Sequence, residues 1–462
     1  MDPAVLSVVQ ATVKQALLSL GFSSVFGFAL GMLCHDRRSI RVLLAFPIAV
    51  PGVVAAAAWV AVLGQHGFVH RLLGEAFLLY SLKAVVIAHV FFNAPWIALR
   101  LIEARSGFPK PQAEAARTLG ASRFQVFTRV EWPFLRPAFT QALAQVWLWC
   151  VMSFSLILIL GGGPPVDTLE TAIYSRIRYG SLNMNGALGC ALWQILLTAL
   201  PAFWLMRQKK NRLESIVSRA PRSASRVQRA FEAFAILIFI SPYFLMIHSK
   251  LFSGLHRDFV LEALGAWSHS LLISLGVSFL VFILSVGAWV GVRRGRSAFL
   301  LPGGLSTLVL SLALWRVYGG FIDFFSGSVF ALIAVQAVLF LPWLVRIGFS
   351  LQQTQPQKEL EAARSLGAKP LRAFLQVDLW RWKGPVLLTL LGVFTASLGE
   401  TAAVSFFQGS GVQTVPLFMM RLMSGYRFDE AEVVAVSLLL FSAVLFSISG
   451  LFLTNSREVH RC

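Results

Sequence analysis

One eight-residue segment occurs twice in this chain. The copies read Glu114-Ala115-Ala116-Arg117-Thr118-Leu119-Gly120-Ala121 and Glu361-Ala362-Ala363-Arg364-Ser365-Leu366-Gly367-Ala368. They differ at one position, and the offset between them is 361 − 114 = 247 residues. Self-similarity at a fixed offset is the signature of a repeated structural unit. The chain is therefore predicted to fold as two copies of one unit.

The repeat extends on both sides of this octamer. Pro95-Trp96 matches Pro342-Trp343 at the same offset, whereas Ser19-Leu20-Gly21 matches Ser274-Leu275-Gly276 at an offset of 274 − 19 = 255. The difference, 255 − 247 = 8, predicts that one connection between Pro47 and Pro95 is eight residues longer in the first copy.

The composition indicates that the repeated unit spans a membrane. Hydrophobic residues are 57% of the 462 residues and charged residues only 13%, against about 25% charged residues in a soluble domain. Runs of about twenty apolar residues, the length of a spanning helix, recur along the chain. The net charge of +19 would suggest a nucleic-acid partner in a soluble protein. Here Lys and Arg cluster between the apolar runs, as in the cytoplasmic loops of membrane proteins, so no nucleic-acid partner is expected.

We predict an all-α integral membrane protein with about eleven transmembrane helices in two homologous polytopic helical domains. The first domain, 1–206, has five expected spans, and the second, 230–462, has six. The spans are expected near 14–34, 43–63, 78–101, 138–160, 184–206, 231–249, 266–292, 298–318, 325–349, 384–407 and 431–453.

A basic linker, 207–229, separates the two domains, and its charge places it in the cytoplasm together with both octamers. The span at 231–249 has no counterpart upstream at the offset of 255. The first domain therefore lacks the first helix of the repeat. With eleven spans, this orientation puts the N-terminus outside.

Each octamer is expected to form a short cytoplasmic helix. Glu and Ala favour helix, and Gly120 and Gly367 stand where a left-handed C-cap is wanted. The alanine pairs 115–116 and 362–363 leave a nearly bare ridge that a partner could approach closely. An ordinary amphipathic surface helix is the alternative. Duplication at matched positions of the topology favours the interaction surface.

These residues resemble a motif of the integral-membrane permease subunits of bacterial ATP-binding-cassette importers. That motif is Glu-Ala-Ala, three residues, Gly, nine residues, an aliphatic residue, one residue and Leu-Pro. The first copy follows it with Glu114-Ala115-Ala116, Gly120, Val130 and Pro133, and with Trp132 in the Leu position. The second follows it with Glu361-Ala362-Ala363, Gly367, Val377 and Leu379, but Trp380 replaces the proline.

The resemblance covers nearly the whole chain and implies its partners. The segments containing Glu114, Ala115, Ala116, Gly120, Glu361, Ala362, Ala363 and Gly367 would be coupling helices that dock on a cytoplasmic ATPase dimer. A periplasmic substrate-binding protein would deliver the substrate to this inner-membrane subunit. The chain has no Gly-x-x-x-x-Gly-Lys-Ser/Thr phosphate loop, so ATP hydrolysis is expected in the separate subunit.

Fused double permeases of this type resemble two substrate groups, thiamine and ferric iron. The segment 130–136, Val-Glu-Trp-Pro-Phe-Leu-Arg, looks like the thiamine permease, as do Leu160-Gly161-Gly162-Gly163-Pro164 and Thr168-Leu169-Glu170. A Gly-Gly-Pro and Thr-Leu-Glu pattern is also similar to iron-type permeases. Thiamine or its phosphates is the favoured substrate, and ferric iron is the alternative.

Three polar residues inside expected spans could line the substrate path. Glu400 is a charge in the span 384–407, which costs about 2.5–3.5 kcal/mol on insertion scales unless it faces the bundle interior or water. It would either partner another helix or contact a cationic substrate. Gln141 and Gln145, one helical turn apart, could line a path or make interhelical hydrogen bonds.

No catalytic site, metal site or cofactor is expected. The eight histidines and four cysteines show no metal-binding or disulfide spacing, and a buried, hydrogen-bonded role is expected for His89. Two other functional classes remain as alternatives. An ion-driven secondary transporter also uses internal repeats, although these are often inverted rather than parallel. A membrane enzyme would require clustered catalytic residues.

Overall fold

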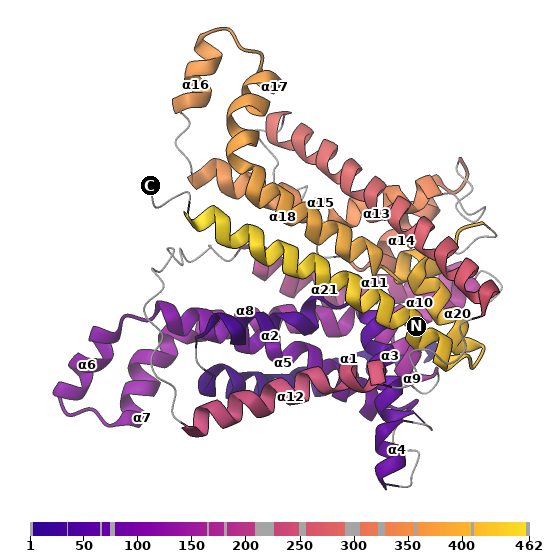
Figure 1. Ribbon diagram of the computed structural model, residues 1–462, viewed down its shortest axis with the longest axis horizontal. Helices are drawn as coiled ribbons and strands as arrows, with labels where there is room; N and C mark the ends of the chain where they lie inside the picture. The colour runs from indigo at the N-terminus through magenta and orange to yellow at the C-terminus, as the bar shows by residue number, and fades with distance from the viewer. Residues whose placement is uncertain are drawn as a thin grey trace. The chain divides into compact units, whose positions relative to one another are not determined.

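The computed structural model describes residues 3–34, 36–64, 67–73, 79–163, 166–179, 183–207, 226–248, 256–291, 305–321, 329–354, 358–407 and 411–458. This part of the chain is helical throughout, without strands (Figure 1). Eight helices are long and apolar enough to cross a membrane, or up to ten if each of two bent pairs is one span. The predicted all-α membrane fold is confirmed.

The first sequence repeat contains eleven α-helices and one π-helix among its described residues. These are α1 (Pro3–Leu33), α2 (Arg38–Ala49), α3 (Gly52–Leu63), α4 (Phe68–Leu73), α5 (Leu82–Gly107), α6 (Lys110–Thr118), α7 (Arg123–Val126), η1 (Phe127–Glu131), α8 (Trp132–Val151), α9 (Ser155–Gly161), α10 (Leu169–Arg178) and α11 (Met184–Arg207).

The second repeat follows the same order after one additional helix. Its elements are α12 (Arg226–His248), α13 (Arg257–Gly291), α14 (Thr307–Tyr318), α15 (Val329–Thr354), α16 (Lys358–Ser365), α17 (Pro370–Ala373), η3 (Phe374–Asp378), α18 (Leu379–Leu398), α19 (Ala402–Phe406), α20 (Val415–Ser424) and α21 (Phe428–Glu458).

The helix boundaries reproduce the sequence repeat. Both ends of α5 and α15 differ by 329 − 82 = 354 − 107 = 247, and both ends of α8 and α18 differ by 379 − 132 = 398 − 151 = 247. Both ends of α3 and α14 differ by 307 − 52 = 318 − 63 = 255. The offset therefore changes between α3 and α5, in the connection that carries α4. This location agrees with the predicted eight-residue difference.

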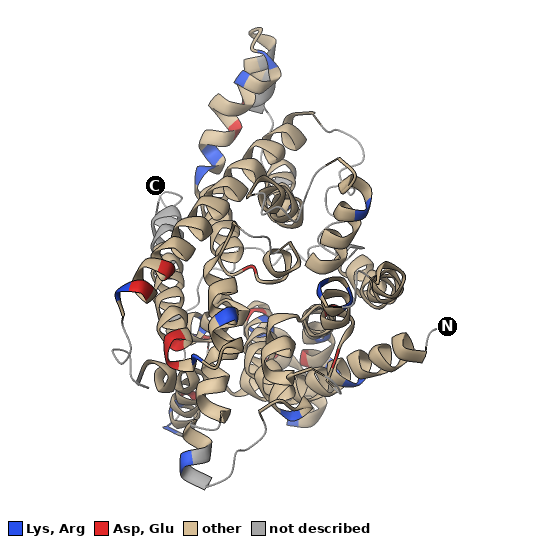
Figure 2. Ribbon diagram, turned by 90° about the vertical axis from the view of Figure 1, so that its right-hand side faces the viewer, with Lys and Arg blue, Asp and Glu red and all other residues tan. Residues whose placement is uncertain are grey.

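The expected number of about eleven spans is compatible with these helices. The predicted span 298–318 is described only from residue 305 onwards, and there it forms the apolar helix α14. The connection 166–183 carries the short helix α10, as predicted. Most of the linker 207–229 lies outside the described residues. Figure 2 shows that charged residues are sparse along the long spans.

Two spans that were predicted as single helices are bent. Helices α2 and α3 meet at 95°, and the segment ending in α8 meets α9 at 58°. The first bend is explained by Pro51, because the residue before a proline is pushed out of helical geometry, and Val50 is extended with ψ 132°. The second bend, at 152–154, contains no proline, and there the predicted span 138–160 consists of two helices, α8 and α9.

The chain divides into two compact units. Unit 1 is residues 1–50, 55–172 and 189–249, and unit 2 is residues 51–54, 173–188 and 250–462. Helix α12, which belongs to the second repeat by sequence, lies in unit 1, where it contacts α2 and α1. The compact units therefore do not coincide with the predicted domains 1–206 and 230–462. Those boundaries remain a prediction about the repeat.

Close packing of the first helix fixes the core of unit 1. A Cβ atom on Gly27 would lie 2.6 Å from the Ile97 Cβ, and one on Gly31 would lie 2.8 Å from the Leu101 Cβ. Only glycine allows α1 to approach α5 this closely, as in small-residue packing between membrane helices. Ala16 and Val146 complete the same buried cluster on α1 and α8. This packing places the C-terminal ends of α1 and α5 together.

Candidate coupling segments and polar breaks in the spans

The first octamer forms the end of α6 and a Schellman motif. The Ala121 N–H donates to the Ala116 carbonyl at 3.0 Å, and the Gly120 N–H donates to the Arg117 carbonyl at 3.0 Å. Gly120 has a φ of +84°, the left-handed geometry that this motif requires. The next short helix, α7, begins with a capping box between Ser122 and Gln125. Strong stop and start signals therefore define the turn between α6 and α7.

The second octamer has the same geometry. The Ala368 N–H donates to the Ala363 carbonyl at 3.1 Å, and Gly367 has a φ of +86°. Glu361 lies within α16, but its side chain is outside the described set. The predicted left-handed caps at both glycines are confirmed. We refer to residues 110–131 and 358–378 as the first and second coupling segments.

A matched pair of apolar side chains projects from the turns of these segments. Leu119 is 88% exposed and Leu366 is 87% exposed, at equivalent positions of the repeat. Phe124 and its counterpart Leu371 are also exposed. The alanine ridge is only partly open, because Ala115 and Ala362 are exposed whereas Ala116 and Ala363 are half-buried. Exposed apolar side chains that cluster on one surface are typical of interaction sites. The motif had not singled out these side chains.

Each coupling segment enters its long span through a π-helix. Residues 127–131 form η1 before α8, and residues 374–378 form η3 before α18. Pro133 lies near the start of α8, and Trp380 takes the equivalent position in α18. The two exits have the same helical boundaries, so the missing proline does not change the local secondary structure.

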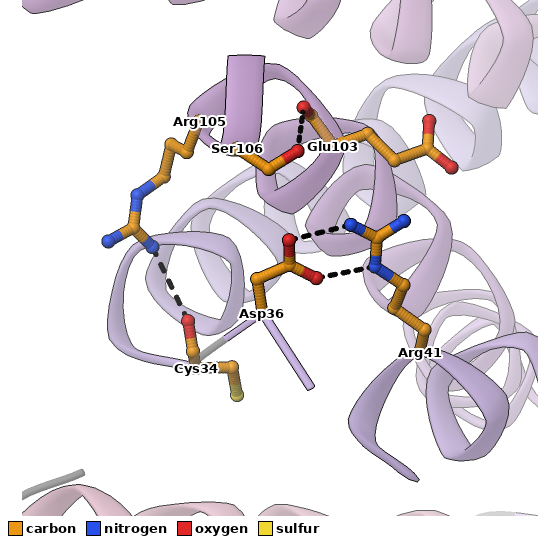
Figure 3. A network of polar contacts seen from close by, with 6 residues as sticks. All are labelled: Cys34, Asp36, Arg41, Glu103, Arg105 and Ser106. Atoms are coloured by element: carbon orange, nitrogen blue, oxygen red, sulfur yellow. Dashed lines mark hydrogen bonds and ion pairs between the residues drawn. The ribbon is translucent and has the colours of Figure 1, made fainter. Parts of the chain in front are cut away.

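Arg105 anchors the base of the first coupling segment. From the last turn of α5, its Nη1 donates to the carbonyls of Gly31 at 2.7 Å and Met32 at 2.9 Å, and lies 3.4 Å from the Cys34 carbonyl. Figure 3 shows Arg105 reaching Cys34, beside the ion pair that joins Asp36 and Arg41. The last carbonyls of a helix have no partner within it, so the guanidinium stabilises the end of α1.

The Cys34 thiol at this turn is not a reactive group. Burial, with a smaller contribution from the Glu232 carboxylate, raises the pKa of Cys34 to about 11. A thiol with such a pKa is protonated at neutral pH, and the thiolate is the nucleophile. Cys34, Cys150 and Cys190 are all buried, as expected for small apolar residues.

The second unit anchors its coupling segment at the equivalent place. Gln352, which corresponds to Arg105 because 352 − 105 = 247, donates from Nε2 to the Trp289 carbonyl at 3.1 Å. Trp289 corresponds to Cys34, because 289 − 34 = 255. The Trp289 ring also packs on Phe374 of η3 and Trp382 of α18. In both units, a side chain at the end of α5 or α15 thus fixes the base of the coupling segment to α1 or α13.

The two coupling segments differ in how they rest on the following span. In the first, the rings of Phe108 and Phe134 meet edge to face with centroids 5.4 Å apart. In the second, Glu359 of α16 forms an ion pair with Arg381 of α18. An exposed ion pair of this kind contributes about 0–1 kcal/mol.

A buried polar cluster holds the break between α8 and α9. His89 of α5 is 3% exposed. Its Nδ1 lies 2.6 Å from Gln15 Nε2 and 3.0 Å from Ser19 Oγ, both on α1, and its Nε2 lies 2.9 Å from Ser153 Oγ in the break. The expected buried, hydrogen-bonded role of His89 is confirmed. Buried polar groups without such partners would be costly.

The equivalent break in unit 2 carries a charge. Glu400 lies between α18 and α19, at the position equivalent to Ser153, since 400 − 153 = 247. It is half-buried, and its Oε1 accepts from the N–H groups of Ala402 at 2.8 Å and Ala403 at 3.2 Å. The carboxylate therefore caps the first turn of α19. This geometry gives Glu400 a structural role without excluding substrate contact at its other oxygen.

A buried glutamine amide with only one of its two polar atoms hydrogen-bonded lies near this charged break. Gln336, the counterpart of His89, is fully buried, and its Oε1 accepts from Ser397 Oγ at 2.5 Å. Its Nε2 has no partner among the described residues. Because amide oxygen and nitrogen can be exchanged in assignment, one polar atom of Gln336 lacks a partner in either orientation. At this break, unit 2 therefore has a carboxylate and an amide with one unpartnered atom. At the equivalent break, unit 1 has a histidine with both ring nitrogens hydrogen-bonded.

The two glutamines on α8 are less constrained. Gln141 and Gln145 are half-buried, and neither makes a side-chain hydrogen bond to another described residue. The predicted alternative of interhelical hydrogen bonds is therefore not observed for this part of the chain. No group of three or more His, Cys, Asp or Glu side chains that could hold a metal ion occurs among the described residues.

Comparison with known proteins finds one matching family model and several full-length relatives. Residues 24–212 match the family described as "Binding-protein-dependent transport system inner membrane component". The chain is 25% identical to the thiamine transport system permease protein of Brucella abortus (strain 2308) over 481 residues, covering 98% of this chain and 88% of that protein. It is 26% identical to the Escherichia coli (strain K12) thiamine transport system permease protein over 476 residues, covering 96% and 88%.

A shorter relative matches less than half of the chain. The probable sulfate transport system permease protein of Prototheca wickerhamii is 28% identical over 199 residues, covering 42% of this chain and 77% of that protein. The fused two-domain size agrees with the thiamine permeases rather than with this relative. The chain is thus similar to inner membrane components of binding-protein-dependent transport systems over residues 24–212, and to thiamine transport permeases over nearly its whole length.

Proposed function

We propose that this chain carries thiamine or its phosphates across the inner membrane by alternating access, driven by a separate cytoplasmic ATPase dimer. The observation that carries the proposal is the pair of equivalent coupling segments. Each segment exposes a leucine at the same position of the repeat. The relatives are named as transport permeases. ATP hydrolysis is assigned to the partner subunit, since this chain has no phosphate-binding loop.

Each coupling segment docks in a groove of the ATPase. Leu119 and Leu366 enter apolar pockets, and the alanine ridge allows close approach of α6 and α16. The exposed Glu114 carboxylate, with Glu361 at the equivalent position, meets basic or N–H groups of the groove. The interfaces are not equivalent, because one segment rests on Phe108 and Phe134 and the other on an ion pair. Gly120 and Gly367 set the direction of the turns.

The substrate assignment rests on the named relatives and on one charge. Full-length relatives are called thiamine permeases, which favours thiamine over ferric iron. Thiamine carries a positive charge, and Glu400 supplies a half-buried carboxylate at a break between two helices. Glu400 contacts the passing cation, while Gln141 and Gln145 line the path on α8. A substrate-loaded periplasmic binding protein delivers thiamine to the outer face.

Replacing both tip leucines by aspartate is expected to abolish coupling. Burying a leucine side chain contributes about 1.5–3 kcal/mol, so each Leu→Asp change should weaken ATPase association by at least about tenfold. The side chains are almost fully exposed in the chain alone, so folding and membrane insertion should be unchanged. Co-purification with the ATPase and uptake of radiolabelled thiamine by cells provide the measurements.

Leu119→Met and Leu366→Met are the matched controls, because they keep an apolar side chain of similar size. Both should retain ATPase binding and uptake. If the double aspartate variant binds the ATPase and imports thiamine like the unmodified chain, the coupling assignment is wrong. Thiamine uptake without any ATPase subunit would instead favour an ion-driven secondary transporter.

A further inference from the structure

The repeat also matches two exposed aromatic residues. Tyr179 and Tyr426 are equivalent, since 426 − 179 = 247, and they are 77% and 81% exposed. Tyr179 directly follows α10, and Tyr426 lies two residues after the end of α20. Both therefore stand at the ends of short helices rather than along the lipid-facing sides of spans. An exposed tyrosine is thus present at the same site of both repeats.

In each repeat the tyrosine follows the coupling segment and one long span along the chain, so the proposed orientation puts it on the opposite side of the membrane from the coupling segment of its repeat. In unit 2, α16 and α17 lie at one end of α18 and α20 lies towards the other (Figure 1). Helix α18 has 20 residues, about 30 Å at 1.5 Å per residue, which is the thickness of the hydrocarbon core. The same order of elements, coupling segment, α8, then α10, occurs in the first repeat.

Tyr426 occupies a position that favours glycine. The Arg427 N–H donates to the Leu422 carbonyl at 2.9 Å and the Tyr426 N–H to the Met423 carbonyl at 3.1 Å, which is the Schellman pattern that ends α20. Tyr426 has a φ of +59°. A left-handed conformation costs a residue with a Cβ atom about 1–2 kcal/mol. Stability alone would therefore select glycine here, as it does at Gly120 and Gly367.

Both rings are held outward with arginines beside them. Tyr426 packs edge to face on Phe428, and Tyr179 on Tyr174. Arg427, which forms an ion pair with Glu430, follows one tyrosine in the sequence, and Arg178 precedes the other. Tyrosine and arginine are enriched among the residues that dominate binding energy at protein interfaces. Residues 173–188 and 250–462 belong to the same compact unit, so unit 2 contains both tyrosines.

We propose that Tyr179 and Tyr426 are docking contacts for the substrate-binding protein on the outer face of the membrane. The inference rests on the proposed function, which supplies this partner, and adds where it binds. The partner surface should offer two pockets that each accept an aromatic ring. Positioning at the membrane interface is the competing explanation, since tyrosines are enriched there. That role would not change the affinity for the binding protein.

The test measures stimulation of ATP hydrolysis by the binding protein. The chain and its ATPase are reconstituted in nanodiscs, and the thiamine-loaded binding protein of the same transporter is titrated. Tyr179→Ala and Tyr426→Gly should each raise the half-maximal concentration by about tenfold, and the double variant by about a hundredfold. Tyr426→Gly relieves the left-handed strain, so it should raise the thermal unfolding midpoint while weakening docking.

Phe321→Ala is the matched control, because Phe321 is 89% exposed and the equivalent position of the first repeat, at the offset of 255, holds no Phe, Tyr or Trp. It should leave the half-maximal concentration unchanged. If the unmodified transporter is stimulated and the tyrosine variants show the same half-maximal concentration, the docking inference is wrong. If the binding protein fails to stimulate the unmodified transporter, both the proposed function and the inference are contradicted.

Discussion

Valine at Gly120 or Gly367 is expected to uncouple the ATPase from transport while leaving the chain in the membrane. The φ angles of +84° and +86° are left-handed, and they cost an ordinary L-residue about 1–2 kcal/mol and a β-branched residue more. A Cβ atom at either glycine would meet no atom within 4 Å. The expected defect therefore comes from backbone conformation rather than from a steric clash.

The altered cap should redirect the tip that carries Leu119 or Leu366. We expect ATPase association to fall by at least about tenfold for each valine variant, with unequal effects on the two segments. Gly120→Asn and Gly367→Asn are the matched controls, because asparagine tolerates the left-handed region. They should retain most of the coupling. Valine variants that bind the ATPase and import thiamine normally would show that the caps have only an architectural role.

Replacing Glu400 by glutamine is expected to reduce uptake by at least about tenfold, an effect equivalent to about 1.4 kcal/mol. The carboxylate Oε1 accepts hydrogen bonds from the N–H groups of Ala402 and Ala403. A glutamine Oε1 can accept the same two bonds, so the cap on α19 survives while the charge is removed. The variant thus separates substrate attraction from support of the helix break.

Glu400→Ala supplies the complementary measurement. It removes both the charge and the cap, and loss of a cap costs about 0.5–2 kcal/mol of stability. The alanine variant should therefore lower the thermal unfolding midpoint, whereas the glutamine variant should leave it unchanged. Normal thiamine uptake by a normally expressed Glu400→Gln protein would remove Glu400 from the substrate path and leave it a purely structural role.

Much of the fold could be predicted because the chain contains two copies of one unit, and the copies can be compared with each other. The offsets of 247 and 255 correctly matched α5 with α15 and α3 with α14. The left-handed caps were predictable because glycine at the end of an alanine-rich helix is a strong local signal. Local signals of this kind act within a few residues, so they can be found without a structure.

The features that sequence reasoning missed depend on distant contacts or on weak local signals. Arg105 contacts the end of α1 more than seventy positions away, and nothing near Arg105 indicates this. The break at Ser153 contains no proline, and the π-helices have no simple sequence signature. Nothing in the sequence distinguishes Leu119 from other leucines near helix ends, and its exposure is visible only in the structure. The structure therefore adds Leu119 to the expected ATPase contacts at the alanines, because its side chain is more exposed than theirs.

Transport in a purified system tests the central claim most directly. Proteoliposomes containing this chain and its ATPase should accumulate radiolabelled thiamine only when the binding protein and ATP are both supplied. Omitting the ATPase, ATP or the binding protein should reduce uptake to background, and a proton or sodium gradient should not restore it. Thiamine accumulation by the chain alone under an ion gradient would contradict the assignment as an ATP-driven, binding-protein-dependent permease.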